Sequence, residues 1–463
     1  MSKPKLLKKF ATICGEQNVS DNELDLIAYD SDLASLPPLL KKIYQLKPPD
    51  YIIRPLTTEQ VAKIIKLAVQ HKIPFTSRAG ASSGTGAVIP VDGGIVLDLT
   101  QMQEILELNA SSHQVTVQPG ITWAKLNRDL NKVGFMVGIH PSSSPSATVG
   151  GFVSTGGYAG IGAPKYGSVG KQIQKLKVIL PSGEISDIYP PLSSLFVGAE
   201  GTLGAITEIT LEIYHQSRKI LPLAFGFADI DSAISPLEKL LKSGLKPYHV
   251  MLFDRYFFDI SKSLGLEGPK NEFVLFITLE GSELNVQNDT EKIQTIFSEK
   301  NEIAKEIAHE EWDRRFKTEL FIKRAGPSLI LLEIGVPLGN VKQVYENLQE
   351  IGAIEKVEIG FCGILGHAGT MLCMPFILTD ERKGMEYLKV LSFSRKLISR
   401  AIKLEGVPYG IGLWNGGYLP YIHDKEKLKI FSDIKSRIDE NNLSNPGKIV
   451  EDRTPEQMRP PKP

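Results

Sequence analysis

Hydrophobic positions along the first half of the chain repeat with two different periods, which predict where helices and strands lie. Between residues 57 and 71 the apolar residues Val61, Ile64, Ile65 and Ala68 recur at helical spacing, so we predict an amphipathic helix there. The same spacing predicts helices over 5–15 and 123–133. Short apolar or alternating runs predict strands over 74–78, 94–99, 115–120, 176–180 and 206–213. Ser20 followed by Glu23 resembles a capping box, which favours an N-terminal helical arm.

The pattern changes after residue 220. Strands are predicted over 221–227, 273–279, 329–336 and 357–363, and helices over 232–242 and 341–351. Loops rich in small residues do not separate these elements. Strands and helices arranged in this way predict a second, α+β domain with a mostly antiparallel sheet.

Length and charge limit the classes of function. At 463 residues the chain is long enough for two or three domains. Its formal net charge of +0 argues against a nucleic-acid partner. The three cysteines, Cys14, Cys362 and Cys373, form no CxxC pattern and are expected to be reduced thiols in a cytoplasmic protein. No apolar run approaches the ~18 residues of a membrane span, so at most peripheral contact with the inner face of a membrane is expected.

Three loops of small residues, at 79–87, 140–151 and 198–204, are the candidate ligand site. Gly, Ser and Thr allow backbone N–H groups to approach a phosphate or a flat ring closely. An ordinary glycine-rich surface loop is the alternative for any one such loop, but the series 141–151, 165–167 and 198–204, with strand-like runs between and after its members, favours a nucleotide-type cofactor. The first loop contains neither Gly-Lys-Ser/Thr nor a Gly-x-Gly-x-x-Gly that opens a helix, which disfavours the classical nucleotide folds.

Six blocks in order resemble one known family. They are Arg54-Pro-Leu-Thr-Thr-Glu-Gln-Val61, Arg78-Ala-Gly-Ala-Ser-Ser-Gly-Thr-Gly86, Val117-Gln-Pro-Gly120, Ala147-Thr-Val-Gly-Gly151, Lys165-Tyr-Gly167 and Gly198-Ala-Glu-Gly-Thr-Leu-Gly204. Over residues 50 to 215 the chain is similar to the FAD-binding domain of the vanillyl-alcohol oxidase / p-cresol methylhydroxylase (PCMH) superfamily. Within it, the chain most resembles the branch that contains D-lactate dehydrogenase and the FAD-linked subunit of glycolate oxidase.

The resemblance implies an α+β fold in four parts. A helical arm at 1–49 precedes a two-subdomain PCMH-type FAD-binding domain at 50–217. A substrate-cap domain follows at 218–410, with a mostly antiparallel sheet flanked by helices. The C-terminal segment, 411–463, contains Asn445-Pro-Gly-Lys448 and is expected to return to the flavin.

The same resemblance implies FAD as the cofactor and names the residues that hold it. The expected cofactor-binding residues are Arg78, Ala79, Gly80, Ala81, Ser82, Ser83, Gly84, Pro141, Ser146, Ala147, Thr148, Gly150, Gly151, Gly157, Tyr166, Glu200, Gly201, Gly204, Ile206, Asn445 and Lys448. Some members attach the flavin to a histidine in the first loop. Ser82 stands at that position here, so we predict non-covalent FAD.

The metal site of the related D-2-hydroxy-acid enzymes is expected to be absent. Those enzymes carry His-x-Gly-Asp-Gly-Asn-x-His and a later Gly-Glu-His-Gly. Here His367 matches the first histidine, but Met374 replaces the second, and Pro408 and Tyr409 replace Glu and His. A thioether is a poor ligand for a hard cation, and a proline side chain has no ligand atom. Glu405 lies at an odd offset that would point it to the other face of a strand.

His367, Tyr409 and Arg315 are the catalytic candidates that the resemblance leaves. An imidazole or a phenol near the flavin could take the substrate's hydroxyl proton, and an arginine fork could pair with a carboxylate. Each has an alternative: His367 as a packing residue, Tyr409 as a core aromatic residue, and Arg315 as part of a solvated basic helix face beside Arg314 and Lys317.

These residues predict an FAD-dependent oxidoreductase. It would oxidise a small 2-hydroxy acid of the lactate or glycolate kind by hydride transfer to flavin N5, and pass electrons to a quinone or protein acceptor, with any iron–sulfur centre on a partner subunit. One alternative is a metal-free alcohol or sugar-acid oxidase with Tyr409 as the base. The other is a flavin-binding, non-catalytic subunit of a dehydrogenase complex.

Overall fold

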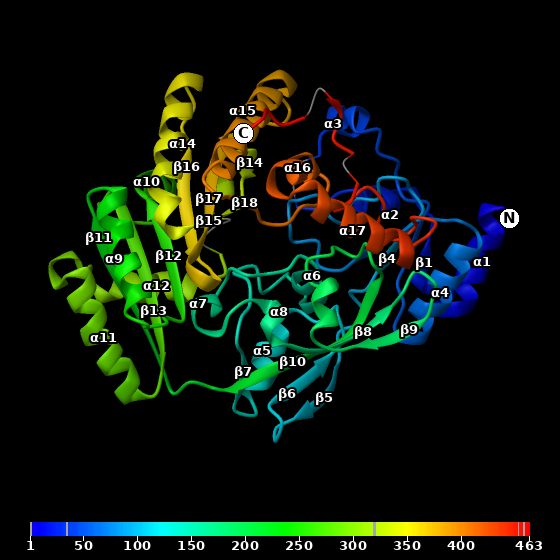
Figure 1. Ribbon diagram of the computed structural model, residues 1–463, viewed down its shortest axis with the longest axis horizontal. Coiled ribbons are helices and arrows are strands. Elements are labelled where there is room, and N and C mark those ends of the chain that lie inside the picture. Colours follow the sequence, from blue (N-terminus) through cyan, green and yellow to red (C-terminus); the bar gives the residue numbers. More distant parts are fainter. Residues whose placement is uncertain (1, 34–35, 318–320, 452, 457–458) are drawn as a thin grey trace.

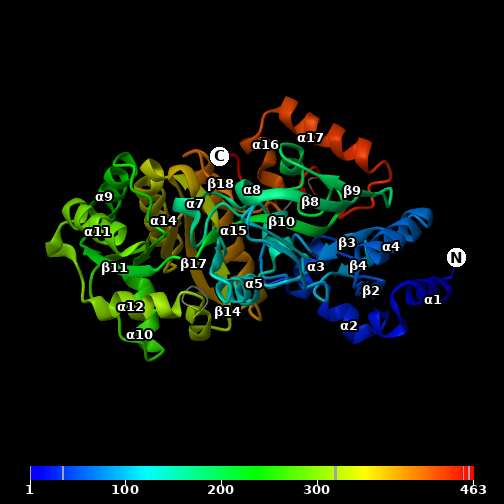
Figure 2. The ribbon, with the colours of Figure 1, turned by 90° about the horizontal axis from the view of Figure 1, so that it is seen from below.

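The computed structural model describes residues 2–33, 36–317, 321–451, 453–456 and 459–463. Two parts lie side by side in Figure 1. One contains both the N-terminal elements and the last helices, and the other is built around a single large sheet. Figure 2 shows the same two parts from below. In the described ranges, no helix combines the length and the apolar composition needed to cross a membrane.

The first part of the chain forms a four-stranded sheet, and three helices precede its second strand. Its order is β1 (Val19–Ser20), β2 (Tyr51–Ile53), β4 (Ile95–Asp98) and β3 (Phe75–Arg78), with β2, β4 and β3 parallel. The helices are α1 (Lys3–Cys14), α2 (Glu23–Ala28), α3 (Pro38–Ile43) and α4 (Thr58–Gln70). The predicted capping box is wrong, because Ser20 belongs to β1 and the Asn22 side chain caps α2. Helix α4 buries the predicted apolar face against the sheet, and Thr57 caps it.

A six-stranded antiparallel sheet completes this part of the molecule. Its order is β5 (Ile105–Asn109), β6 (Gln114–Val117), β10 (Ala205–His215), β8 (Ile173–Ile179) and β9 (Ile185–Ile188), and β7 (Phe135–Val137) also pairs with β10. The helices around it are α5 (Trp123–Asn131), α6 (Val149–Ser154), α7 (Ala163–Tyr166) and α8 (Val169–Gln172). The first glycine-rich loop follows β3, the second follows β7 and the third leads into β10.

The second part is an eight-stranded sheet, called here the cap sheet. Its order is β11 (Lys219–Phe227), β13 (Phe273–Gly281), β12 (His249–Asp254), β16 (Gly360–Leu365), β17 (Thr370–Thr379), β15 (Ile334–Pro337) and β18 (Val407–Pro408), and β14 (Ser328–Leu331) also pairs with β17. Every pair in it is antiparallel. The helices α9 (Ile230–Lys242), α11 (Glu283–Phe297), α14 (Val341–Glu355) and α15 (Gly384–Ile402) cover one face, and α10 (Arg255–Ser263) and α12 (Lys305–Arg314) pack on the other.

The strand predicted over 329–336 is two strands. The register pairs Leu331 with Phe376 and Ile334 with Cys373, so Leu332 lies opposite Pro375. The Leu332 N–H donates to the Pro375 carbonyl at 2.9 Å. Pro375 has no N–H, so it cannot donate the second hydrogen bond of this pair to the Leu332 carbonyl. The ladder therefore breaks there, and Glu333 lies at the break.

The C-terminal helices cross back from the cap sheet. Helices α16 (Leu419–Ile422) and α17 (Lys425–Ile438) lie over the N-terminal part in Figure 1. Buried Lys435 of α17 donates to the carbonyls of Thr202 and Ser444, both at 2.8 Å, and to Asp439 at 2.5 Å. These bonds join the third glycine-rich loop to the last segment of the chain.

Candidate active site

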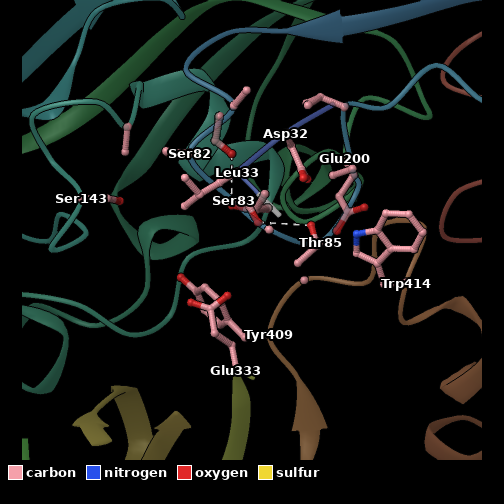
Figure 3. Close-up of a pocket in the computed structure, with 18 of the residues that line it drawn as sticks. Asp32, Leu33, Ser82, Ser83, Thr85, Ser143, Glu200, Glu333, Tyr409 and Trp414 are labelled. Atoms are coloured by element: carbon pink, nitrogen blue, oxygen red, sulfur yellow. Dashed lines mark hydrogen bonds between the residues drawn. The ribbon is translucent and has the colours of Figure 1, made fainter. Parts of the chain in front are cut away.

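A cavity of about 410 Å³ lies between the glycine-rich loops and the cap sheet. Figure 3 shows it with Ser82, Ser83 and Thr85 on the loop side and Tyr409 and Glu333 on the cap side. Its size is in the range of cofactor and small-molecule sites. The cavity therefore links the predicted cofactor loops to the cap sheet in one continuous space.

The first loop is packed so closely that its second residue must be glycine. A Cβ on Gly80 would lie 2.3 Å from the Ser146 carbonyl oxygen. The next residue, Ala81, has a φ of 47°, the left-handed region that lets neighbouring N–H groups turn toward one ligand. Arg78 at the start of the loop donates from Nη1 to the Ser31 carbonyl at 2.6 Å. The loop is thus fixed from behind with its backbone facing the cavity.

Most of the residues predicted to bind the cofactor lie on the cavity wall. They are Arg78, Ala79, Gly80, Ala81, Ser82, Ser83, Gly84, Pro141, Ala147, Thr148, Gly150, Gly151, Glu200, Gly201, Gly204 and Ile206. Five others do not line it: Ser146, Gly157, Tyr166, Asn445 and Lys448.

Four of the five are supports behind the wall. The Ser146 carbonyl lies against Gly80, and a Cβ on Gly157 would lie 2.1 Å from the Phe152 ring. Buried Asn445 donates to the carbonyls of Ala87 at 2.9 Å and Glu200 at 2.6 Å. Buried Lys448 donates to the Ile89 carbonyl at 2.9 Å, and burial lowers the pKa of its ammonium to about 8. The C-terminal segment therefore fixes the loops from behind.

Tyr166 belongs to the junction between the two parts of the molecule. Its hydroxyl donates to Glu280 Oε1 of β13 at 2.5 Å, and Lys165 Nζ lies 2.9 Å from the same oxygen. Ser217 donates to the other oxygen of this carboxylate, whose side chain is fully buried. The Lys165-Tyr-Gly167 block thus holds the cap sheet against the cofactor-binding part.

Replacing Glu280 with glutamine should destabilise the protein. The amide NH₂ would face donors that now point at a carboxylate oxygen, and an unsatisfied buried donor costs about 1–3 kcal/mol. We expect a lower urea midpoint for Glu280→Gln. The control is Glu291→Gln on the exposed side of α11, which should change stability by less than about 0.5 kcal/mol. Equal midpoints for the two variants would contradict this role of Glu280.

Tyr409 lies on the cap-side wall, beside an acidic residue that was not among the candidates chosen from the sequence. The Tyr409 N–H donates to the Glu333 carbonyl at 2.9 Å, and both side chains line the cavity. In Figure 3 they rise from the cap strands toward the loops. Around them the wall is apolar and includes Leu372 and Met374. A lone acid in the apolar run 329–336 was the signal that could have identified Glu333.

His367 and Arg315 do not line the cavity. His367 is at the tip of the β16–β17 hairpin, where a Cβ on Gly167 would lie 3.7 Å from its Nδ1. Arg315 follows α12 and donates from Nη1 to the Trp312 carbonyl at 2.6 Å, with its guanidinium 4.3 Å from the Trp312 ring centroid. The guanidinium thus stacks on the rings of Trp312 and Phe316 outside the cavity, and a role in binding a carboxylate stays a prediction.

Other charged groups reach the cavity wall. Exposed Lys323 and half-buried Arg395 lie on the cap side, and Arg395 donates to the Tyr44 hydroxyl at 3.1 Å. Asp32 lies on the loop side and accepts from the Gly86 N–H at 2.6 Å. None of the three was a candidate from the sequence, because only the folded chain brings residues 32, 323 and 395 to one cavity.

The residues present do not fit the metal site of the related 2-hydroxy-acid enzymes. Met374 contributes a thioether to the wall where those enzymes have a histidine, and His367 lies away from it. Within the part of the chain that the structure describes, no three or more His, Cys, Asp or Glu side chains are grouped to hold a metal ion.

Comparison with known families gives two matches along the chain. Residues 49–189 match the model of an FAD binding domain, and residues 217–449 match that of the FAD linked oxidases, C-terminal domain. The first covers the first two glycine-rich loops and ends after β9, the third loop lies between the two matches, and the second match covers the cap sheet and the segment that returns from it.

Curated relatives and solved structures agree with these matches. The glycolate oxidase subunit GlcD of Bacillus subtilis is 27% identical over 94% of this chain and 95% of its own length. The mitochondrial D-lactate dehydrogenase [cytochrome] of Arabidopsis thaliana is 26% identical over 87% of this chain and 73% of its own. The crystal structure of p-cresol methylhydroxylase with substrate bound has a TM-score of 0.84 at 18% identity and covers 97% of both chains, a likeness in fold.

Proposed function

The chain belongs to the FAD-linked oxidases, and on that premise we propose that it oxidises a CH–OH substrate at the wall formed by Tyr409 and Glu333, without a protein-bound metal ion. The observation that carries the proposal is the continuity of the cavity from the first glycine-rich loop to these two side chains. A substrate in the cap-side half would lie between the cofactor loops and a proton acceptor.

The chain's own contribution is to bind the substrate, orient it and accept its proton. Bound FAD supplies the hydride acceptor. In this proposal Tyr409 accepts the hydroxyl proton as its own phenolic proton passes to the Glu333 carboxylate, which lines the same wall. The surrounding Leu329, Leu331 and Met374 side chains exclude water from the reacting carbon.

The loop side of the cavity fits the FAD that the family uses. Gly80 leaves room that a Cβ would fill, and Ala81, on the cavity wall, has the left-handed backbone that lets neighbouring N–H groups converge on one anion. We propose that the FAD is held non-covalently, because Ser82 offers a hydroxyl where covalent members have a histidine. Flavin that stays with the precipitate after acid denaturation would contradict this.

The apolar cap-side wall supports a substrate with an apolar body, such as a neutral primary or secondary alcohol. A small 2-hydroxy acid is the second candidate, supported by the names of the relatives and by the two cations on the wall. Because Glu333 would repel a carboxylate placed beside Tyr409, the acid group would have to lie toward Lys323 or Arg395.

Anaerobic flavin bleaching tests the function. We expect one class among neutral alcohols, D- and L-2-hydroxy acids and sugar acids to bleach the bound flavin, with the same rate in a chelator. If a 2-hydroxy acid bleaches the flavin and the rate of bleaching is lower in Lys323→Met, the second candidate is supported. A flavin that no compound reduces would instead support a non-catalytic subunit, and a rate that a chelator abolishes would refute the metal-free proposal.

The electron acceptor is proposed to be a quinone or another protein. The three cysteines are buried singly in the core, which supports placing any iron–sulfur centre on a partner chain. Mixing the reduced enzyme with a soluble quinone analogue under anaerobic conditions tests this. Reoxidation by oxygen alone would contradict it.

A further inference from the structure

The segment that carries Tyr409 is an irregular loop whose backbone is held almost entirely by other parts of the chain. Residues 409–415 follow β18, and positive φ angles of 79° at Gly410 and 52° at Gly412 bend them sharply. The Tyr409 N–H donates to Glu333, and the Leu413 and Trp414 N–H groups both donate to the Thr85 carbonyl, at 2.9 and 3.2 Å. The loop's shape is therefore determined by what surrounds it.

Glu200 accepts two backbone N–H bonds from the segment just after Tyr409. Its Oε1 accepts from the Ile411 N–H and its Oε2 from the Gly412 N–H, both at 2.8 Å. Bonds to an ionised carboxylate are roughly twice as strong as those between neutral groups. Glu200 belongs to the third glycine-rich loop, and its own carbonyl accepts from Asn445 at 2.6 Å. The carboxylate thus joins the cofactor side of the cavity to the loop that ends in Tyr409.

We propose that Glu200 is a positioning residue, which holds the 409–415 segment so that the Tyr409 hydroxyl meets the substrate, rather than a residue that binds the cofactor. The proposal rests on the proposed role of Tyr409. Both oxygens of Glu200 are used on backbone N–H groups of this segment. Tyr409 is two residues from the nearer of them, so a change at Glu200 is transmitted through one glycine.

The charge of Glu200 should appear in the pH dependence of the reaction. Burial, with a smaller contribution from the Asp32 charge, raises the pKa of the Glu200 carboxyl to about 7, against the lowering effect of the Gly412 and Ile411 N–H groups and of Lys448. As the pH falls through this pKa, one oxygen becomes an O–H donor and can no longer accept the N–H that faces it. We expect the rate of flavin reduction to fall below about pH 7 even at saturating substrate.

The test compares Glu200→Gln with Glu208→Gln by stopped-flow flavin reduction between pH 5.5 and 9. A glutamine at position 200 keeps one acceptor and turns its NH₂ toward the other N–H, so we expect the reduction rate to fall about 10- to 100-fold. The fall in rate below about pH 7 should disappear in this variant. Its KM and FAD content should stay close to wild type. Glu208 on β10 pairs with Lys177 at 2.9 Å away from the cavity. Glu208→Gln should keep both the wild-type rate of flavin reduction and the fall in that rate below about pH 7.

A second readout separates this proposal from the role of Tyr409. Trp414 lies in the same segment, 5.0 Å from the Tyr44 ring. We expect tryptophan fluorescence of the holoenzyme to titrate near pH 7 in the wild type, but not in Glu200→Gln or Trp414→Phe. If the fluorescence follows this pattern while Tyr409→Phe still reduces flavin at the wild-type rate, then Glu200 holds the segment but Tyr409 is not the proton acceptor. Loss of FAD from Glu200→Gln, or an unchanged rate and acid limb, would overturn the positioning role.

Discussion

Tyr409→Phe should lower the rate of flavin reduction by substrate about 10²- to 10⁴-fold, the range that a positioned proton acceptor contributes. Phenylalanine keeps the ring that packs against Tyr158 at 4.8 Å and removes only the hydroxyl. FAD content and the melting temperature should therefore stay near wild type. The measurement is the first-order rate of anaerobic bleaching at saturating substrate.

Tyr158→Phe is the matched control. Its ring touches that of Tyr409, but its side chain does not line the cavity, and its hydroxyl packs on Gly335 of β15. We expect it to reduce flavin at close to the wild-type rate. Glu333→Gln should resemble Tyr409→Phe, since both would break the same proton path. A Tyr409→Phe enzyme as fast as Tyr158→Phe would rule Tyr409 out as the proton acceptor.

Gly80→Ala should weaken FAD binding by between about five- and 150-fold, which corresponds to the 1–3 kcal/mol that overpacking costs. The new Cβ would lie 2.3 Å from the Ser146 carbonyl oxygen, which is backbone and cannot rotate away. The first loop must therefore shift and carry its N–H groups away from the cofactor. The dissociation constant is measured by titrating FAD into apoprotein.

Gly384→Ala makes the same chemical change where nothing lies within 4 Å of the new Cβ. It is at the first position of α15, and we expect FAD affinity to be unchanged. If Gly80→Ala binds FAD as tightly as Gly384→Ala, the first loop does not hold the cofactor in the way its packing indicates.

Much of the cofactor side could be predicted from the sequence, because local chemistry dictates it. Glycine and serine were required wherever backbone must approach a ligand, and the first loop shows why at Gly80 and Ala81. The antiparallel cap sheet also followed from local pattern. The family is confirmed by the two domain matches, whereas the roles of individual cofactor residues stay predictions.

The cap-side chemistry could not be predicted, because it depends on register and on long-range approach. Matching His367 to a family motif did not reveal that it lies at a hairpin tip next to Gly167. Lys165 and Tyr166 resembled part of a cofactor motif, but the structure shows their partner to be Glu280, more than a hundred residues away. A short motif fixes which residues are present, not which surface they face.

The sequence by itself determined that this chain folds around three close-packed glycine-rich loops that fit FAD, since the absence of a side chain acts locally on the backbone. Only the tertiary structure decided which other groups share a cavity with those loops. Glu333 reaches the cavity because the register of the cap sheet sets it opposite Met374, which lines the same wall. Glu200 reaches the Tyr409 segment, over two hundred residues away, because the chain returns from the cap sheet to the loops.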